Sequence, residues 1–397
     1  MAFLRFFYKL MQTILAFFSS FFQNKKILIG LFLFGLVFKV FAIRFYPYPG
    51  DFIGFIVPWV DFIKANGYLD AFRYPFANYA PAYLYFLLGI AKFNLDTLYG
   101  VKLISIFFDY LIAWFVGSMA YEKYKESWVR WCALAVIPLL PTVLVNSSYW
   151  GQCDSVYTAF LMGSLYFVLK RKSLLSVLFW GISFSFKLQA IMLAPFFFVL
   201  LLRNRIKWYY FLLVPAVYVL SVMPAYIAGR PLSDLLTIYV AQSEQYKELS
   251  LNFTNLYMWI SDNYYHVVKW IGMGVTALFT LVMGGLLAWK YPSKLTNDYL
   301  IRLAFLSAAI CPFLLPGMHE RYMFAGDVLA VAYILYFPRK FYNAIGIPIV
   351  SLFSCSLCTS LREIFLPYPA FLMTLLYVFF LYLLIRDFVQ SVQAEKN

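Results

Sequence analysis

Charge is scarce in this sequence. Only 13% of its 397 residues are charged, whereas 63% are apolar and the mean hydropathy is +0.76. A soluble domain is about one-quarter charged, and no soluble fold of this length could bury so much apolar surface. Lipid must therefore solvate much of the chain.

Residues that bind metals are sparse as well. Two histidines are too few for a histidine-based metal site, and the five cysteines lack the spacing of metal ligands. Cys355 and Cys358 lie in an apolar run, which favours helix packing over a redox role. The sequence also has no glycine-rich nucleotide loop, no low-complexity tract and no separate soluble domain. It predicts one integral-membrane domain over residues 1–397.

The net charge of +14 does not indicate a nucleic-acid partner. The basic residues fall mostly in short loops between apolar runs, where they set membrane topology. Aromatic residues make up 22% of the chain. Tyr and Trp gather at membrane interfaces, so a chain with many short loops can carry many of them. Membrane lipids are the expected surroundings.

Apolar runs long enough for helices recur along the chain. A bilayer core needs about 20 apolar residues per helix. The fold class is therefore all-α, a polytopic membrane protein with about 12 transmembrane helices, within a range of about 10 to 13. The two pairs 174–186/188–202 and 303–316/320–337 could each be broken helices or a helix with a re-entrant partner. The predicted spans are 27–46, 100–121, 131–147, 155–169, 174–186, 188–202, 208–226, 264–289, 303–316, 320–337, 342–361 and 367–385.

The distribution of basic residues predicts the orientation. With the N-terminus in the cytoplasm, 20 of the 32 Lys and Arg residues fall in cytoplasmic segments. Residues 1–26 are then a cytoplasmic interfacial helix, and residues 386–397 a cytoplasmic tail. Two long loops lie outside, at 47–99 and 227–263. We expect interfacial helices in the first, around residues 56–65 and 82–93, the latter interfacial or re-entrant.

Two polar features follow the ends of predicted spans on the outer side. The first is Gly50-Asp51, where glycine allows close approach of a ligand, although a lone loop aspartate is usually only solvated. The second is residues 146–154, which include Gln152 and Asp154. This turn could cap the next helix, with Asp154 as the N-cap residue. A capping aspartate at a cavity mouth can still face a substrate.

Two further features carry cationic side chains. Lys187 stands between two short apolar runs; an ionisable residue within a membrane indicates function, and snorkelling to the interface is the alternative. His319, Glu320 and Arg321 are consecutive at another boundary. Arginine binds phosphate with a planar fork of donors, and an ordinary polar turn is the alternative.

Together these features resemble the GT-C superfamily of integral-membrane glycosyltransferases. The resemblance rests on the acid Asp51 after the first span, Trp-Gly-Gln-Cys-Asp at 150–154, Phe-Lys-Leu-Gln at 186–189, and His-Glu-Arg-Tyr at 319–322. It covers about residues 30 to 340 and is strongest to bacterial mannosyltransferase-like proteins related to GPI mannosyltransferases. Asp51 is followed by Phe52, not by the second acid of some relatives, so a divalent metal requirement stays open.

The resemblance implies an inverting transfer of a hexose such as mannose. The donor would be a polyprenyl-phosphate-linked sugar, and the acceptor a hydroxyl of a glycan, lipid or protein. It implies an extracytoplasmic active site, in a bacterial plasma membrane rather than the endoplasmic reticulum. Asp51 would be the catalytic base. Lys187, His319 and Arg321 would bind the donor phosphate. The residues expected to hold sugar or acceptor are Trp150, Gln152, Asp154, Tyr79 and Glu320. No protein metal ligands are predicted.

Two other classes of function fit the same pattern. A transporter or flippase of lipid-linked sugars also needs a basic, aromatic cavity, but the hydropathy shows no internal repeat of the kind that transporters often have. Another lipid-processing enzyme, such as an acyltransferase or glycan ligase, would also fit the His-Glu-Arg turn. The glycosyltransferase interpretation further requires that the four polar features meet in space.

Overall fold

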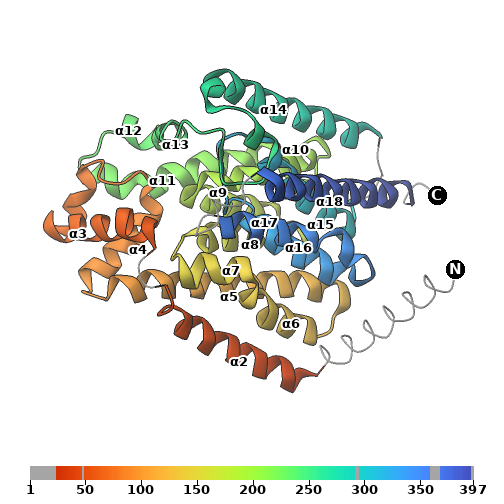
Figure 1. The fold of residues 1–397 in the computed structure, drawn as a ribbon, viewed down its shortest axis with the longest axis horizontal. Coiled ribbons are helices and arrows are strands. Elements are labelled where there is room, and N and C mark those ends of the chain that lie inside the picture. Colours follow the sequence, from red (N-terminus) through yellow and green to blue (C-terminus); the bar gives the residue numbers. More distant parts are fainter. Residues whose placement is uncertain (1–23, 47–48, 291–294, 358–366, 395–397) are drawn as a thin grey trace.

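The computed structural model describes residues 24–46, 49–290, 295–357 and 367–394. Within these residues the protein consists of helices and one pair of two-residue strands (Figure 1). The predicted all-α class is therefore confirmed. The interfacial helix expected over residues 1–26 lies almost wholly outside the described residues.

The α-helices follow one another along the chain with short turns between them. The short 3-10 and π turns used below are η1 (Phe52–Ile56), η3 (Ile137–Leu139), η4 (Val145–Tyr149) and η5 (Leu188–Leu193). The strands are β1 (Ser250–Leu251) and β2 (Met318–His319). The helices are α2 (Lys25–Ala42), α3 (Val57–Ala65), α4 (Pro81–Lys92), α5 (Thr97–Tyr124), α6 (Trp128–Val136), α7 (Pro141–Leu144), α8 (Asp154–Leu169), α9 (Ser173–Phe186), α10 (Ala194–Leu202), α11 (Leu213–Ile227), α12 (Leu232–Leu236), α13 (Ile238–Ser243), α14 (Tyr265–Lys290), α15 (Asn297–Leu314), α16 (Phe324–Tyr336), α17 (Gly346–Leu357) and α18 (Pro367–Ala394).

Five helices in the described part are long and apolar enough to cross a membrane. A sixth span results if the segments Trp128–Leu139 and Pro141–Tyr149, which are bent by 58° relative to each other, are taken as one. Five further apolar helices have 10–17 residues, among them α8, α9 and α16. These findings support a membrane protein, but they do not confirm the predicted count of twelve spans. The five long spans are Thr97–Tyr124, Trp208–Ile227, Asp262–Leu287, Asn297–Leu314 and Phe371–Gln393.

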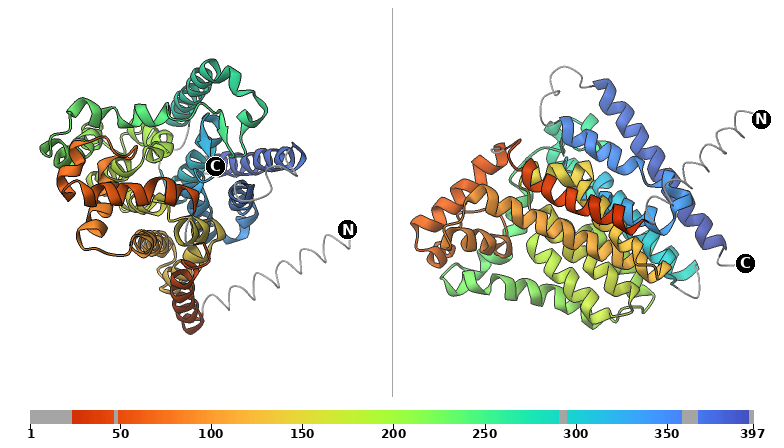
Figure 2. Two further views of the ribbon diagram at one scale, coloured as in Figure 1. Left: turned by 60° about the vertical axis from the view of Figure 1, so that its left-hand side comes forward. Right: turned by 90° about the horizontal axis from the view of Figure 1, so that it is seen from below.

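Helix α5 is one of the two most deeply buried of the five long helices, together with α15. It begins where the Asp96 side chain accepts a hydrogen bond from the backbone N–H of Tyr99 at 2.9 Å. It ends at Lys125, whose φ of 59° lies in the left-handed region that closes many helices. Between these ends 67% of its apolar window is buried, against 22% for the window in α14. Helices α2, α14 and α18 lie at the periphery (Figure 2).

The two ends of the bundle differ in chemistry. At one end, on the left of Figure 1, lie α3, α4, α12 and α13, which are the helices of the two long connections predicted at 47–99 and 227–263. At the other end the short basic connections meet acids from neighbouring helices. Lys123 pairs with Asp298 at 2.9 Å, and Lys170 with Glu122 at 3.0 Å. The chain thus separates long polar connections from short basic ones.

The segment predicted as a C-terminal tail from residue 386 is helical as far as Ala394, because α18 continues through it. Asp387 explains the extension. Its carboxylate is 2% exposed and lies 2.7 Å from Nε of Arg302 on α15 and 2.5 Å from Nζ of Lys340. This ion-paired cluster fixes the end of α18 against the bundle.

Candidate functional site

The turn at residues 146–154 runs from within η4 to the first residue of α8. The backbone N–H of Gln152 donates to the carbonyl of Asn146 at 2.9 Å, and Gly151 has a φ of +66°, which favours glycine. Asp154 is the first residue of α8, and the N-cap position belongs to Cys153 without a side-chain capping bond. The predicted N-cap role of Asp154 is therefore wrong, since its carboxylate faces other side chains instead.

Asp154 is the buried anion at the centre of the site. Its Oδ1 atom lies 2.5 Å from Nζ of Lys187, and its Oδ2 atom accepts a hydrogen bond from Nδ2 of Asn146 at 2.9 Å. Lys187 is the extended residue that ends α9, and its side chain is 7% exposed. Lys187 is thus ion-paired inside the protein rather than snorkelling to an interface.

Arg321 connects the three acids of the site. Its Nη1 atom donates to Glu320 Oε1 at 2.7 Å, and its Nη2 atom lies 3.4 Å from Oδ2 of Asp51. Its Nε atom lies 3.9 Å from Oδ2 of Asp154. The guanidinium is 12% exposed. A planar fork of donors can contact several carboxylates at once, so this one side chain brings three sequence features together.

Asp51 is the accessible acid of the cluster. It directly precedes η1, and 47% of its side chain is exposed. Gln152 Nε2 donates to its Oδ2 atom at 3.0 Å. The side chains of Asp154 and Glu320 are 0% and 7% exposed. A molecule that reaches the site from solvent or from the membrane surface therefore meets Asp51 first.

The pairing of β1 with β2 holds His319 and Glu320. The strands are parallel, with Leu251 opposite His319. The backbone N–H of Glu320 donates to the carbonyl of Leu251 at 3.0 Å, and that of Gly317 to Leu249 at 2.8 Å. The second long connection therefore fixes the backbone on which Arg321 is carried.

Charge and burial set the protonation of this turn. Burial lowers the pKa of His319, so the imidazole is neutral near pH 7. Burial opposes ionisation of Glu320, but the neighbouring Arg321 and His319 outweigh it and hold the pKa of Glu320 at about 2. Nδ1 of His319 lies 3.8 Å from Oε2 of Glu320. Glu320 is thus a permanent anion at physiological pH.

Aromatic rings surround the charged cluster. The Tyr246 ring lies 5.4 Å from the His319 ring, and the Lys187 ammonium lies 5.4 Å from the Tyr322 ring. Tyr79 packs 5.2 Å from the Trp59 ring, and burial raises the pKa of its phenol. Trp150 is half-buried in the 146–154 turn, and within the described chain its side chain has no polar contact with the cluster. The structure therefore places Tyr79 next to the charged cluster, whereas Trp150 lies beside the cluster without a polar contact to it in the described chain.

Polar atoms beside Asp154 lack a hydrogen-bond partner within the described residues. They include Oδ1 of Asn146 and Nε of Arg321, whose residues both contact the Asp154 carboxylate. Buried polar atoms are almost always bonded in folded proteins. An acceptor and a donor beside the same carboxylate are groups that a hydroxyl-rich or phosphorylated ligand could satisfy.

No group of three His, Cys, Asp or Glu side chains suited to a metal ion occurs among residues 24–46, 49–290, 295–357 and 367–394. The guanidinium of Arg321 stands between the acids Asp51, Asp154 and Glu320. The sequence left a divalent metal requirement open, and the described residues provide no ligand set for such a metal.

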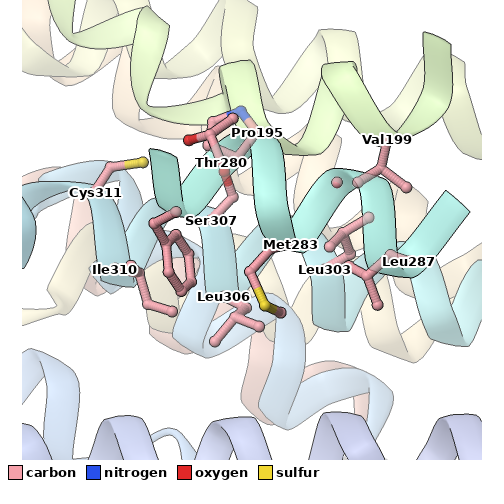
Figure 3. A pocket seen from close by; sticks show the side chains of 12 residues that line it. Pro195, Val199, Thr280, Met283, Leu287, Leu303, Leu306, Ser307, Ile310 and Cys311 are labelled. Carbon is pink, nitrogen blue, oxygen red and sulfur yellow. The ribbon is translucent and has the colours of Figure 1, made fainter. Parts of the chain in front are cut away.

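A separate apolar groove lies between α10, α14 and α15 (Figure 3). Its cavity volume is about 30 Å³, and its lining includes Pro195, Met283 and Leu306. Ser307 is one of its few polar residues, and its hydroxyl donates to the carbonyl of Met192 at 2.8 Å. None of the predicted site residues lines this groove.

Sequence reasoning missed three charged residues beside the turn. Lys39 and Asp109 form a buried ion pair at 2.8 Å, and Lys102 donates to the carbonyl of Tyr46 at 2.8 Å. All three lie within apolar helices. Charges in such segments are rare and indicate function, and this signal could have identified them.

The arrangement can perform proton transfer and charge stabilisation in one place. It holds an exposed carboxylate, two buried cations with unused donors and a neutral imidazole. No known family model matches the chain, and no curated protein matches it as a relative in sequence.

Proposed function

We propose that this protein is an inverting glycosyltransferase that moves a hexose such as mannose from a polyprenyl-phosphate donor to a hydroxyl acceptor. The observation that carries the proposal is the half-exposed Asp51 carboxylate beside the buried Arg321 guanidinium, with Nη2 and Oδ2 3.4 Å apart. This places a proton acceptor next to a cation, and the displacement of a phosphate leaving group by a hydroxyl needs both. The GT-C resemblance of the same residues supports the proposal.

The proposed site lies on the non-cytoplasmic face of the membrane. The connections that hold Lys123, Lys170 and Lys340 lie at the end of the bundle opposite the long connections, and the positive-inside rule assigns that end to the cytoplasm. The donor tail would stay in lipid, with its phosphate and sugar at the interface. Such a donor needs no nucleotide-binding domain.

In the proposed reaction the acceptor oxygen attacks the anomeric carbon and gives its proton to Asp51. A bond from that oxygen to the anomeric carbon forms as the bond from the carbon to the phosphate oxygen breaks. The electron pair leaves with the phosphate, which gains one negative charge. Attack from the face opposite the phosphate inverts the configuration. Charge appears on the phosphate as the transition state forms, so preorganised cations there lower the barrier.

Arg321 and Lys187 are the proposed phosphate ligands. Arg321 uses Nη1 and Nη2 on Glu320 and Asp51, and its Nε atom has no hydrogen bond to any of the described residues. Lys187 has three donors and contacts one carboxylate, that of Asp154. Each cation therefore keeps donors for an additional anion. His319, neutral near pH 7, would add a hydrogen bond without adding charge.

The buried acids take a supporting role in this proposal. Asp154 and Glu320 are almost wholly enclosed and already hold Lys187 and Arg321, so they would orient the cations. Gln152 and Tyr79 remain the proposed contacts for sugar or acceptor hydroxyls. Trp150, half-exposed at the side of the turn, is a proposed stacking surface for a sugar ring.

The test is sugar transfer by purified protein in nanodiscs, offered a small panel of polyprenyl-phosphate sugars. Release of polyprenyl phosphate is followed for the native protein and for Asp51→Asn. Asp61→Asn is the matched control, because Asp61 is an exposed acid of α3 in the same connection. We expect release by the native protein and the control but not by Asp51→Asn.

Full activity of Asp51→Asn would overturn the base assignment. Absence of release with every donor, together with movement of a donor across liposomes, would favour a flippase of lipid-linked sugars. Analysis of the product by NMR decides the stereochemistry. Retention of the anomeric configuration would contradict direct displacement.

A further inference from the structure

A second buried ion pair lies beside the candidate site. Nζ of Lys39 on α2 is 2.8 Å from Oδ2 of Asp109 on α5, and both side chains are 0% exposed. The two helices bring these charges together from distant parts of the sequence. Neither residue contacts Asp51, Arg321 or Lys187 among the contacts of the described chain.

Both members of the pair also bind serines of the site turn. Nζ of Lys39 donates to Oγ of Ser147 at 2.8 Å and to the carbonyl of Pro138 at 3.0 Å. The Ser155 hydroxyl donates to Oδ1 of Asp109. Ser147 belongs to η4 and Ser155 to the first turn of α8, so the pair reaches both sides of the turn.

Ser147 and Ser155 are the chain neighbours of two site residues. Asn146 precedes Ser147, and Asp154 precedes Ser155. Asn146 and Asp154 bond each other at 2.9 Å, and Asp154 holds Lys187. Fixing the two serines therefore fixes the entry and exit of the loop that carries Gln152.

Stability alone does not account for this pair. Removal of two charges from water is costly, and apolar residues of similar volume often pack as stably. An ion pair with serine partners differs from an apolar pair in one respect. Its hydrogen bonds fix the positions and directions of the groups that they join. We propose that Lys39 and Asp109 are positioning residues that set the geometry of the turn at residues 146–155. Their effect on sugar transfer rests on the proposed function, whereas their effect on the turn does not.

Cys153 provides a reporter of turn geometry that needs no substrate. Its thiol lies within the turn, and the residue is 3% exposed. In a background with the other four cysteines replaced by alanine, the rate of N-ethylmaleimide labelling measures how often the turn opens. A tenfold faster rate corresponds to an opening free energy lower by about 1.4 kcal/mol.

Two variants test the proposal by different routes. Lys39→Met/Asp109→Leu removes both charges together, so no unpaired charge is left buried. Ser147→Ala/Ser155→Ala keeps the ion pair and removes only its link to the turn. We expect both to label Cys153 about tenfold faster than the parent, with thermal unfolding midpoints close to the parent value.

The matched control removes another buried ion pair. In Arg302→Met/Asp387→Leu the lost charges belong to α15 and α18, and we expect the labelling rate of the parent. Parent-like labelling of the serine variant would overturn the proposal even if the charge variant failed to fold. Equal acceleration in the control would also overturn it, because the effect would then be general loosening.

Sugar transfer by the same variants separates this inference from the proposed function. We expect the serine variant to lower kcat about tenfold, with a smaller change in KM. Faster labelling with no transfer by any protein, the parent included, would leave the positioning role intact and reject the glycosyltransferase. Faster labelling with an unchanged kcat would overturn a role of the pair in catalysis.

Discussion

The carboxylate of Asp154 and the ammonium of Lys187 lie 2.5 Å apart, with side chains 0% and 7% exposed. One begins α8 and the other ends α9. Each charge is removed from water and compensated mainly by the other. The pair therefore joins two of the four polar sequence features, and substitution of either partner would disrupt the contact between them.

Loss of one member of this pair should destabilise the protein. Breaking a buried ion pair costs about 3–5 kcal/mol, because the remaining charge is uncompensated. We expect Lys187→Met to lower the midpoint of thermal unfolding in detergent and Lys187→Met/Asp154→Asn to recover part of the loss. Lys340→Met is the control, since Lys340 is 40% exposed. A Lys187→Met protein that unfolds with the native midpoint would contradict the buried pair.

Replacement of Arg321 by lysine should slow transfer strongly while the protein still folds. The guanidinium contacts Glu320 and Asp51 through different nitrogens, and an ammonium cannot reproduce that fork. We expect kcat at saturating donor to fall by about 10²-fold or more, as for loss of one preorganised donor. Arg73→Lys, at an exposed arginine of the first long connection, should keep the native rate. Native kcat in Arg321→Lys would exclude the phosphate-binding role.

Mild acid should destabilise the protein through His319. Burial lowers the pKa of His319, so the unfolded state binds a proton near pH 6.5 that the folded state does not. Stability therefore falls as the pH drops through about 6.5. We expect the unfolding midpoint of the native protein to decrease from pH 7.5 to pH 5.5, and His319→Gln to reduce this decrease. The same pH slope in both proteins would contradict the assignment.

Stronger acid should act through Glu320. Its pKa of about 2 in the folded protein lies below the ordinary value of 4.5. Its contribution to stability is present above about pH 4.5 and is lost as the pH falls toward 2. Compared with the native protein, Glu320→Gln should therefore be less stable at neutral pH and lose less stability between pH 5 and pH 3. Parallel curves across this range would contradict the ion pair with Arg321.

Gly151 should tolerate alanine less well than Gly317. Both have positive φ, +66° and +69°, so alanine costs about 1–2 kcal/mol at either position. A methyl group on Gly151 would also lie 3.3 Å from Cγ of Lys102, whereas at Gly317 the nearest atom is 3.8 Å away. We expect the lower unfolding midpoint for Gly151→Ala. Equal unfolding midpoints would show that the Lys102 side chain moves aside without a cost in stability.

The residue types of the site could be predicted from the sequence, because charges and amides beside apolar runs are conspicuous. Asp51, Gln152, Lys187 and Arg321 come from four such places. Asp51 contacts both Gln152 and Arg321, and Asp154 links Arg321 to Lys187. The pairing of these residues was not predictable. The contact between Arg321 and Asp51 depends on the path of the backbone after α15.

Helix type was easier to predict than helix length. Apolar composition gave helices throughout, but a run such as Asp154–Leu169 is too short to settle whether it crosses the bilayer by itself. The expected N-cap at Asp154 failed because tertiary ion pairing with Lys187 took the carboxylate. Lys39 and Asp109 were overlooked because each appears in the sequence as an isolated charge, and only packing of α2 against α5 makes them a pair.

The strands β1 and β2 also constrain how the chain is threaded. Ser250 and Met318 are paired neighbours, so both must end up in the same aqueous compartment. Between them lie α14 and α15, both long and apolar enough to cross a membrane. Two crossings return the chain to the side it left. In the proposed topology both helices cross the bilayer, so His319 can reach its partner strand only after both have inserted. In that topology, an insertion error in either helix would leave Arg321 and Asp51 on opposite sides of the bilayer.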